Sequence, residues 1–585
     1  MRRILLIPFL FIAFVMSAAP IGEKRAREIA EKFFAEAATK AGNASLVLEW
    51  AGNDMDGAVL TKSAQGDIDR AFLYIYNREG NNGFVVIAGD DNVKPILAFS
   101  YSGSFELNNM PDGARYILSG WCKQVQAARN STVTKVATKS GSSVGNIICE
   151  YQTALWGQRE PYNREAPVIN ESRCVTGCVA TAMSILAYYH KFPERGIGTI
   201  GTYHPEYEDG PHTLGRTYDY NNMLPSYHDE NGQPLAYTDE QGNNVAALMY
   251  DMGRSVTMSY GPQESLAMFS SIPNALITHF SYSKSALLIQ GQSYPYEEWV
   301  NMLQQNLAEY GPTLFSGRNN SEGHTMILDG CTDAGYFRFN YGWDGWANGY
   351  YLLPEQQFAY NQDAIFYLEP DSEGTSTYQD MINLNSNSGV NGIETDVVGE
   401  FAKCQQFNLR MGSAVNKGVT KFTGDVAIAL CSANGSVKQI LHTFSNCEIN
   451  CNYGIYSDAA IPVTITENLA EGDRIRVVYD GAYSDGWQWA RRYSEGVVDE
   501  IIVYASPDDI AESLGISYVK ETQTLTFVSA IPVVYSVKDS SSNEKTSGNA
   551  AAKQSINIDM QAYAAGTYTF SFKSGGNPYV LTIIK

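Results

Sequence analysis

Two patterns of hydrophobic residues, one with helical and one with strand spacing, follow one another near the N-terminus. Residues 23–38 carry apolar side chains at the spacing of a one-sided helix, at Ile29, Ala30, Phe33, Phe34 and Ala37. β-branched and aromatic runs come next, and they predict strands over residues 71–76, 84–88 and 96–101. The pattern therefore predicts a small α+β unit.

The pattern changes twice further along the chain. Residues 130–145 and 371–392 are polar stretches without a hydrophobic period, which is typical of exposed connectors. Beyond residue 392, short alternating runs separated by Gly, Asn and Asp turns predict two β-modules. Their expected strands are residues 426–430, 440–444 and 474–479, then 516–519, 525–528, 533–537, 567–572 and 579–584.

The first residues have the pattern of a secretory signal peptide. Arg2 and Arg3 precede an apolar run over residues 4–15, and small residues follow at 17–19. This run is too short to span a bilayer, and no later stretch is long and uncharged enough to do so. We expect a secreted or cell-surface protein without a transmembrane segment.

Net charge and cysteine content exclude some classes of function. The formal net charge of -22 argues against a nucleic-acid partner, which would need a basic surface. Nine cysteines leave at least one thiol unpaired, and in an exported chain that thiol is either buried or reactive. His204 and His212 flank an acidic loop but lack metal-ligand spacing on a regular element, so we expect no metal.

Cys178 stands at the head of a predicted buried helix. Thr176 is expected to cap this helix and Gly177 to let the backbone turn, while an apolar face follows and Pro193 ends it. In the first helical turn the dipole and a neighbouring imidazolium would lower the pKa of the thiol. The alternative is a small core residue, the commoner fate of a free cysteine.

A second cluster of candidate residues lies well beyond Cys178. His324 opens an apolar strand, and an Asn-Tyr-Gly-Trp segment begins at Asn340. The order Cys, His, Asn in distant segments is the one a papain-like thiol protease needs for a nucleophile, a base and an orienting residue. The Asn340 amide can accept the imidazole N–H, and Trp343 or Trp346 can shield that bond from water. The alternative for His324 is an ordinary half-exposed imidazole.

Acyl transfer also needs hydrogen-bond donors for the oxyanion of the tetrahedral intermediate. Gln158, twenty residues before Cys178, offers a side-chain N–H, and the backbone N–H of Cys178 would be the second donor. Outside this context Gln158 is an ordinary surface glutamine.

These segments resemble the streptopain family of bacterial papain-fold cysteine peptidases. The matching residues are 156–158, 161–163, 176–181, 189–193, 218–225, 248–262, 323–324 and 340–345. The resemblance implies that Cys178 is the nucleophile, His324 the general base and Gln158 the oxyanion donor. It also implies peptide substrates with an apolar side chain two positions before the cut.

The orienting residue departs from the family pattern, in which a tryptophan of an Asn-Trp-Gly-Trp-Gly-Gly segment is often given that role. Here Tyr341 replaces the first tryptophan and Asp344 replaces a glycine. The candidates that remain are Asn340 and Trp343.

The N-terminal unit resembles the streptopain propeptide over residues 83–91 and 93–97. The resemblance implies an inhibitory domain that covers the cleft and pushes His324 away from Cys178 until it is removed. We expect removal by cleavage in the connector, near Lys135 or Lys139. The alternative is a plain structural domain.

The expected fold class is α+β, with a papain-like cysteine protease core, an α+β propeptide and C-terminal all-β sandwich domains. The expected boundaries are a signal peptide at 1–19, an inhibitory propeptide at 20–140, a catalytic domain at 146–370, a β-sandwich module at 393–508 and a β-domain at 511–585. The last module weakly resembles the secretion and sorting domains of the Bacteroidota; the alternative is a β-sandwich that binds protein or sugar.

We therefore expect a secreted cysteine endopeptidase made as a zymogen, which cleaves protein or peptide substrates through a thioester, is inhibited by its own propeptide and uses no cofactor. Two alternatives stay open. The core could be catalytically inert, with β-modules that bind host protein or glycan, or the chain could act as a protease inhibitor through its N-terminal unit.

Overall fold

The computed structural model describes residues 20–37, 45–53, 70–106, 112–130, 144–204, 210–229, 232–318, 323–353, 360–576 and 578–585. The expected signal peptide and the residues around Lys135 and Lys139 lie outside the described residues. The chain divides into two compact units, Met1–Tyr282 with Glu297–Gly374 and Ser283–Tyr296 with Thr375–Lys585. The predicted α+β class, with β-rich C-terminal parts, is confirmed.

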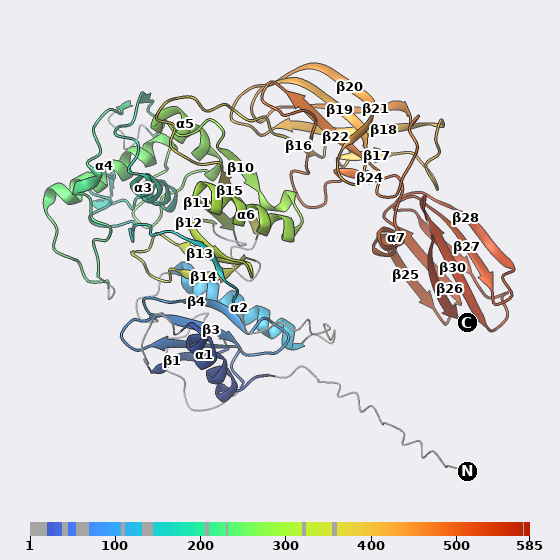
Figure 1. Ribbon diagram of the computed structural model, residues 1–585, viewed down its shortest axis with the longest axis horizontal. Coiled ribbons are helices and arrows are strands. Elements are labelled where there is room, and N and C mark those ends of the chain that lie inside the picture. The colour runs from blue at the N-terminus through green and yellow to red at the C-terminus, as the bar shows by residue number, and fades with distance from the viewer. Residues whose placement is uncertain are drawn as a thin grey trace, which may run out of the picture. The chain divides into compact units, whose positions relative to one another are not determined.

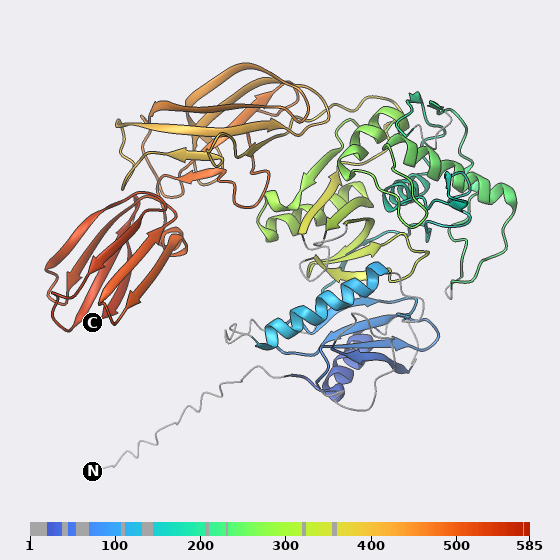
Figure 2. The same ribbon diagram turned by 180° about the vertical axis from the view of Figure 1, so that it is seen from behind.

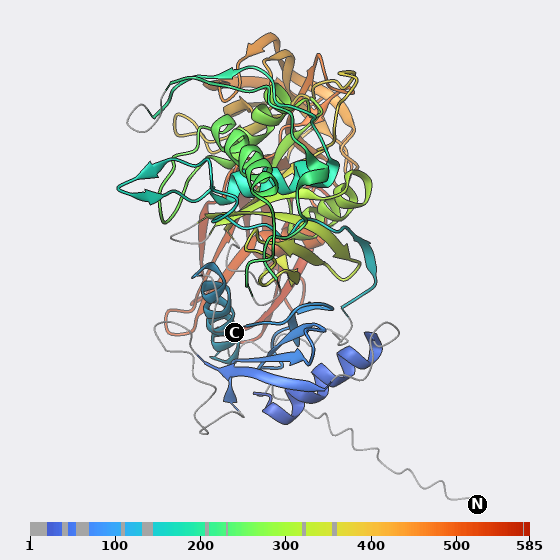
Figure 3. The same cartoon turned by 90° about the vertical axis from the view of Figure 1, so that its left-hand side faces the viewer.

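The N-terminal part of the first unit is a small sheet between two helices. Its elements are α1 (Glu23–Ala37), β1 (Leu46–Gly52), β2 (Leu73–Arg78), β3 (Phe84–Ala88), β4 (Ile96–Ser100) and α2 (Asp112–Asn130). Figure 3 shows α1 and α2 on opposite sides of these strands. The sequence analysis missed β1 and α2, although α2 buries Leu118, Trp121, Cys122 and Val125 at helical spacing.

The central block supplies the remaining helices and strands of the first unit. Its helices are α3 (Cys178–His190), α4 (Asp239–Ser255), α5 (Ile272–Phe280) and α6 (Tyr296–Tyr310). Its longer strands are β5 (Ile147–Glu150), β11 (Thr313–Arg318), β12 (Gly323–Thr332), β13 (Tyr336–Asn340), β14 (Gly349–Leu352) and β15 (Tyr360–Phe366). Two short strand pairs are β6 (Val168–Ile169) with β7 (Ser172–Arg173) and β8 (Thr199–Ile200) with β9 (His212–Thr213).

One sheet runs through the whole first unit, as Figure 1 shows. The strand order is β1-β2-β3-β4-β14-β13-β12-β11-β15, and β5 lies beside β12. The N-terminal strand β4 is joined to β14 of the central block by an antiparallel pairing of Phe99 with Tyr350 and of Ala98 with Tyr351. The N-terminal part is therefore held to the central block by shared backbone pairing as well as by side-chain packing.

Helix α3 carries Cys178 into the core of the block. All residues from Val179 to Ala187 are buried, so the helix is covered on every side and not only on the predicted apolar face. The predicted Thr176 cap is wrong, because Gly177 is the N-cap and no side chain caps it. The Thr176 hydroxyl lies 2.8 Å from that of Thr181, which occupies it inside the turn.

Within the second unit, the described residues of Thr375–Lys585 form β-sheets and the short helix α7, drawn in orange and red in Figure 2. The first set of strands is β16 (Ile382–Asn385), β17 (Ile393–Thr395), β18 (Gln406–Asn416), β19 (Phe422–Cys431), β20 (Val437–Ile449), β21 (Gly454–Thr464), β22 (Arg474–Gly481), β23 (Gln488–Trp489) and β24 (Glu500–Ile502). They form a four-stranded and a five-stranded sheet. Buried residues from both sheets make one core, which is the arrangement of a β-sandwich.

The second set of strands follows α7 (Pro507–Ser513). It comprises β25 (Leu514–Val519), β26 (Thr524–Ser529), β27 (Val533–Asp539), β28 (Glu544–Ala550), β29 (Ser555–Asp559), β30 (Thr567–Lys573) and β31 (Tyr579–Ile584). These strands form a three-stranded and a four-stranded sheet over a second core.

One connector prediction is wrong within the second unit. Strand β16 lies inside residues 371–392, which the sequence analysis treated as an exposed connector. Ile382 and Leu384 are buried in the sandwich core and hold this short strand against β18.

Among the described residues, no helix has the length and apolar character needed to cross a membrane.

Candidate active site

Cys178 is the first residue of α3, and tight backbone packing fixes its position. Gly177 has a φ of 84°, and a Cβ there would come within 2.9 Å of the Met258 side chain and of the Ser265 carbonyl oxygen. Only glycine fits a left-handed backbone so closely packed. Cys178 is partly exposed as a residue.

His324 lies in β12, where its backbone is paired with Gly317 of β11. Its Nε2 is 2.9 Å from the carbonyl oxygen of Tyr341. A carbonyl can only accept a hydrogen bond, so Nε2 must carry the proton, and in the neutral ring Nδ1 is then the basic nitrogen. The Tyr341 contact therefore selects the tautomer that a general base requires.

The structure brings Cys178 and His324 together from α3 and β12. Burial by itself raises the pKa of the Cys178 thiol, but hydrogen bonding to His324, the charge of His324 and hydrogen bonds from Thr325 outweigh it. The pKa of the thiol is therefore held below its ordinary value. A thiolate stabilised by an adjacent imidazolium is the activated form of a cysteine nucleophile.

Trp343 lies beside the imidazole, as expected. The centroids of the His324 and Trp343 rings are 4.8 Å apart, and Tyr341 stacks on Trp343 at the same distance. These rings cover the contact between His324 and the Tyr341 carbonyl with apolar surface.

Asn340 has a different place from the one expected. Its amide nitrogen donates to the Thr153 hydroxyl and to the Ala154 carbonyl, each at 2.9 Å, and its amide oxygen accepts from the Gly342 N–H at 3.1 Å. The expectation that this amide accepts the imidazole N–H is corrected, because the acceptor found is the Tyr341 carbonyl. Asn340 instead fixes the turn that presents Tyr341 and ties it to residues 153–154.

The expected displacement of His324 by the N-terminal unit is also corrected. That unit is packed in place, yet the thiol and the imidazole already interact. The N-terminal unit reaches the site through the edge pairing of β4 with β14 and through Phe105, whose ring centroid lies 5.4 Å from that of Trp346. Trp346 in turn lies 6.4 Å from Trp343, the ring beside His324.

Gln158 lies close to the head of α3 through its backbone. Its carbonyl oxygen accepts from the Thr176 N–H at 3.1 Å, and its side chain is partly exposed. The loop that carries Gln158 is thus hydrogen bonded to the loop that leads into Cys178.

Asp344 is a site residue to which the sequence analysis gave no role. Its N–H donates to the Trp156 carbonyl at 3.2 Å, and its carboxylate accepts from the Tyr162 hydroxyl at 2.8 Å and lies 2.9 Å from His228 Nδ1. A Cβ on Gly157 would lie 2.1 Å from the same carboxylate. The only signal in the sequence was the replacement of a family glycine by Asp344.

The Asp344 contacts have a consequence for charge and position. The hydrogen bond to Asp344 raises the pKa of His228 above its ordinary value, against the effect of burial. An ion pair therefore connects the segment that carries Trp343 with the loop at His228, and the Tyr162 hydrogen bond connects it with the segment that carries Gln158.

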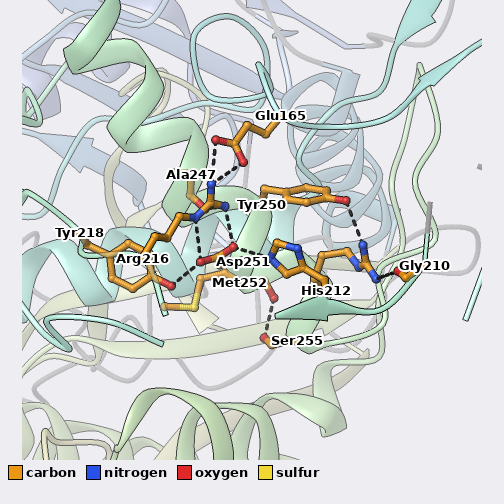
Figure 4. A network of polar contacts seen from close by, with 11 residues as sticks. Glu165, Gly210, His212, Arg216, Tyr218, Ala247, Tyr250, Asp251, Met252 and Ser255 are labelled. Atoms are coloured by element: carbon orange, nitrogen blue, oxygen red, sulfur yellow. Dashed lines mark hydrogen bonds and ion pairs between the residues drawn. The ribbon is translucent and has the colours of Figure 1, made fainter. Parts of the chain in front are cut away.

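A second polar centre in the same unit surrounds the fully buried Asp251 of α4, as Figure 4 shows. One carboxylate oxygen is 2.7 Å from His212 Nε2 and accepts from Arg216 at 2.6 Å. The other accepts from Arg216 at 3.0 Å and from the Tyr218 hydroxyl at 2.7 Å. His212, discounted as a metal ligand, thus serves to fix a loop onto α4.

Comparison with known proteins gives the family. Residues 156–351 match the model of the peptidase C10 family, and residues 18–125 match that of the Spi protease inhibitor. The central block is therefore similar to the peptidase C10 family. The prediction of a cysteine peptidase related to streptopain is thereby confirmed.

Relatives of this chain include streptopain of Streptococcus pyogenes, which is 28% identical over 356 residues, or 57% of this chain and 82% of streptopain. The thiol protease/hemagglutinin PrtT of Porphyromonas gingivalis is 27% identical over 360 residues, which are 58% of this chain but only 39% of PrtT. A solved fragment of Prevotella intermedia prointerpain A is 27% identical, has a TM-score of 0.42 and is matched over 96% of its length by 52% of this chain.

Proposed function

We propose that the chain is the secreted zymogen of a cysteine endopeptidase that cleaves protein or peptide substrates. The observation that carries this proposal is the contact between the Cys178 thiol and His324, which lowers the pKa of the thiol at the head of a buried helix. A core residue of purely structural function would have no need of a histidine with a fixed tautomer beside it.

The reaction would begin with attack of the Cys178 thiolate on the scissile carbonyl carbon. The backbone N–H of Cys178 and the side-chain N–H of Gln158 would stabilise the oxyanion. His324 would then protonate the leaving amine as the C–N bond breaks, which leaves a thioester. A water molecule deprotonated by His324 would hydrolyse the thioester and release the acid.

Two neighbouring residues would support these steps without touching the substrate. Trp343 would exclude water from the bond between His324 and the Tyr341 carbonyl, since its ring lies against the imidazole. Asn340 would hold the turn that presents this carbonyl.

The match to the Spi protease inhibitor supports an inhibitory role for the N-terminal unit. Maturation would require cleavage in the connector at 130–145. Incubating a Cys178→Ala chain alone and with active enzyme tests self-processing: we expect a size shift only with active enzyme, and a shift of the variant alone would contradict it.

Export rests on the residues 1–19 pattern, and a sorting role for residues 511–585 rests on the weak resemblance stated above. Fusing residues 511–585 to a reporter protein and comparing its release with that of the unfused reporter tests the sorting role.

Hydrolysis of casein tests the activity. We expect hydrolysis that iodoacetamide abolishes, with the alkyl adduct located on Cys178 by mass spectrometry. An intact casein substrate after maturation would favour the inert binding protein instead, and inhibition of a related peptidase by the Cys178→Ala chain would favour the inhibitor.

A further inference from the structure

A second pair of thiols lies in the first unit, away from the proposed nucleophile. Cys149 of β5 is paired in register with Cys331 of β12, and the two sulfur atoms are 3.6 Å apart. All nine cysteines are free in this structure. Directly opposed residues of antiparallel strands have Cβ atoms about 4.5–5.5 Å apart, close to the separation that a disulfide requires.

The two thiols differ in access. Cys149 is partly exposed, whereas Cys331 is fully buried. Hydrogen bonding with Cys331 lowers the pKa of Cys149, and the same contact together with burial raises the pKa of Cys331. Cys149 is therefore the thiol that meets an external reagent first, and Cys331 is placed to react second.

We propose that Cys149 and Cys331 form a disulfide that secures the new N-terminal end of the processed enzyme to β12. The oxidant would be a small-molecule or protein disulfide. The Cys149 thiolate attacks one sulfur of that disulfide, whose S–S bond breaks and releases one thiolate. The Cys331 thiol then gives up its proton and attacks the Cys149 sulfur of the mixed disulfide, which releases the second thiolate. Two protein thiols are oxidised to one disulfide, and the reagent is reduced to two thiols.

The position of β5 explains how the disulfide between Cys149 and Cys331 would stabilise the processed enzyme. Cleavage in the connector at 130–145 would leave β5 a few residues from a free chain end, where strands fray. Two of its four residues, Ile147 and Ile148, are about half exposed, so little apolar burial holds the strand in place. The cross-link would fasten it to the strand that also carries His324.

Fraying of β5 would reach the proposed active site along the chain. Thr153 and Ala154, which follow β5, accept the two hydrogen bonds that fix Asn340 and its turn. Gln158 lies four residues further on. A fixed β5 therefore protects both the turn that presents the Tyr341 carbonyl and the segment that offers the oxyanion donor.

The bond is tested on the full-length Cys178→Ala chain, because that variant removes the proposed reactive thiol. After incubation of the folded protein with oxidised glutathione, we expect one peptide pair joined through Cys149 and Cys331 and a mass loss of about 2 Da for two hydrogens. Adding Cys149→Ser, or Cys331→Ala as a second variant, should abolish the cross-linked pair, while Cys174→Ser should not. A lasting glutathione adduct on Cys149, or two free thiols after oxidation, would overturn the proposal.

The use of the bond rests on the proposed maturation and is tested separately. Hydrogen exchange at residues 147–154 should be slower in oxidised processed enzyme than in processed Cys149→Ser enzyme, and the difference should be smaller before processing. Equal exchange in the two processed forms would exclude the securing role. The disulfide is mapped on an unprocessed, inactive chain. Its presence or absence can therefore be determined even if the proposed protease function is wrong.

Discussion

In the first unit, the Cys178 thiol lies against His324 and the Asp251 carboxylate lies against His212. In both cases the partners outweigh burial and hold the pKa of the acid below its ordinary value. They differ in what else surrounds the acid. Asp251 is fully buried and accepts hydrogen bonds from an arginine and a tyrosine besides its contact with the histidine, whereas Cys178 is a partly exposed residue at a helix end.

The comparison distinguishes a reactive group, the Cys178 thiol, from a structural group, the Asp251 carboxylate. Every oxygen of the Asp251 carboxylate has two partners, so no site remains for another molecule. Cys178 is partly exposed as a residue, and its histidine keeps a basic nitrogen. Removing a partner should therefore abolish activity at the first centre and stability at the second.

The largest expected effect is that of His324→Ala on hydrolysis. Loss of the base and of the thiolate partner should lower kcat/KM by roughly 10³-fold or more, as for other members of a catalytic unit. The free energy of unfolding should change by less than about 2 kcal/mol, since no buried charge is left unpaired. Casein hydrolysis and denaturant unfolding measure the two. An equally large loss of stability would remove the contrast between the centres.

Asp251→Ala should show the opposite behaviour. It removes the buried partner of Arg216, which then keeps only Glu165 as an ion-pair partner among the described residues, and breaking a buried ion pair costs about 3–5 kcal/mol of stability. Thermal unfolding of the unprocessed chain would measure it, with Glu165→Gln, which removes only the partly exposed partner of Arg216, as the milder control.

The Asp251 centre also makes a pH prediction. Because the folded state lowers the pKa of Asp251, its contribution to stability is present above the ordinary carboxyl pKa of about 4 and is lost as the pH falls through the lowered value. The loss of stability on acidification should be shallower in Asp251→Ala. An unchanged acid dependence would show that other carboxylates dominate.

Asp344→Asn should have the smallest effect on activity. It tests whether the proposed catalytic centre also depends on a structural ion pair. Weakening the ion pair with His228 and the hydrogen bond from Tyr162 would loosen the segment that carries Gln158, and we expect kcat to fall about tenfold, or about 1.4 kcal/mol, with KM little changed. In His228→Gln, which keeps the hydrogen bond between Tyr162 and Asp344, kcat should fall less.

The pH profile distinguishes this positioning role from a merely structural one. The raised pKa of His228 means that its ion pair is fully present below the ordinary histidine pKa of about 6.5 and is lost as the pH rises through the raised value. The Asp344→Asn variant should lack that step in kcat. The same step in both proteins would exclude the role.

Much of the first unit could be read from local patterns. The helix at 23–38 and the strands at 84–88 and 96–101 appear within a residue or two of their predicted ends, because helical spacing and β-branched runs are local signals. Strand β16 escaped prediction because its short, Asn-rich sequence looks like a connector until the partner strand β18 buries Ile382 and Leu384.

The sequence by itself determined which residues could carry the chemistry and which family they resemble. A cysteine after a glycine at a helix head, a histidine at a strand start and a Gly/aromatic segment are local and specific. Only the tertiary structure decided the partners of these residues: the Tyr341 carbonyl instead of the Asn340 amide for His324, His228 for Asp344, and Cys331 for Cys149. The reason is that a partner is chosen by strand register and by the direction of each side chain, and these are fixed by pairing between segments far apart in the chain.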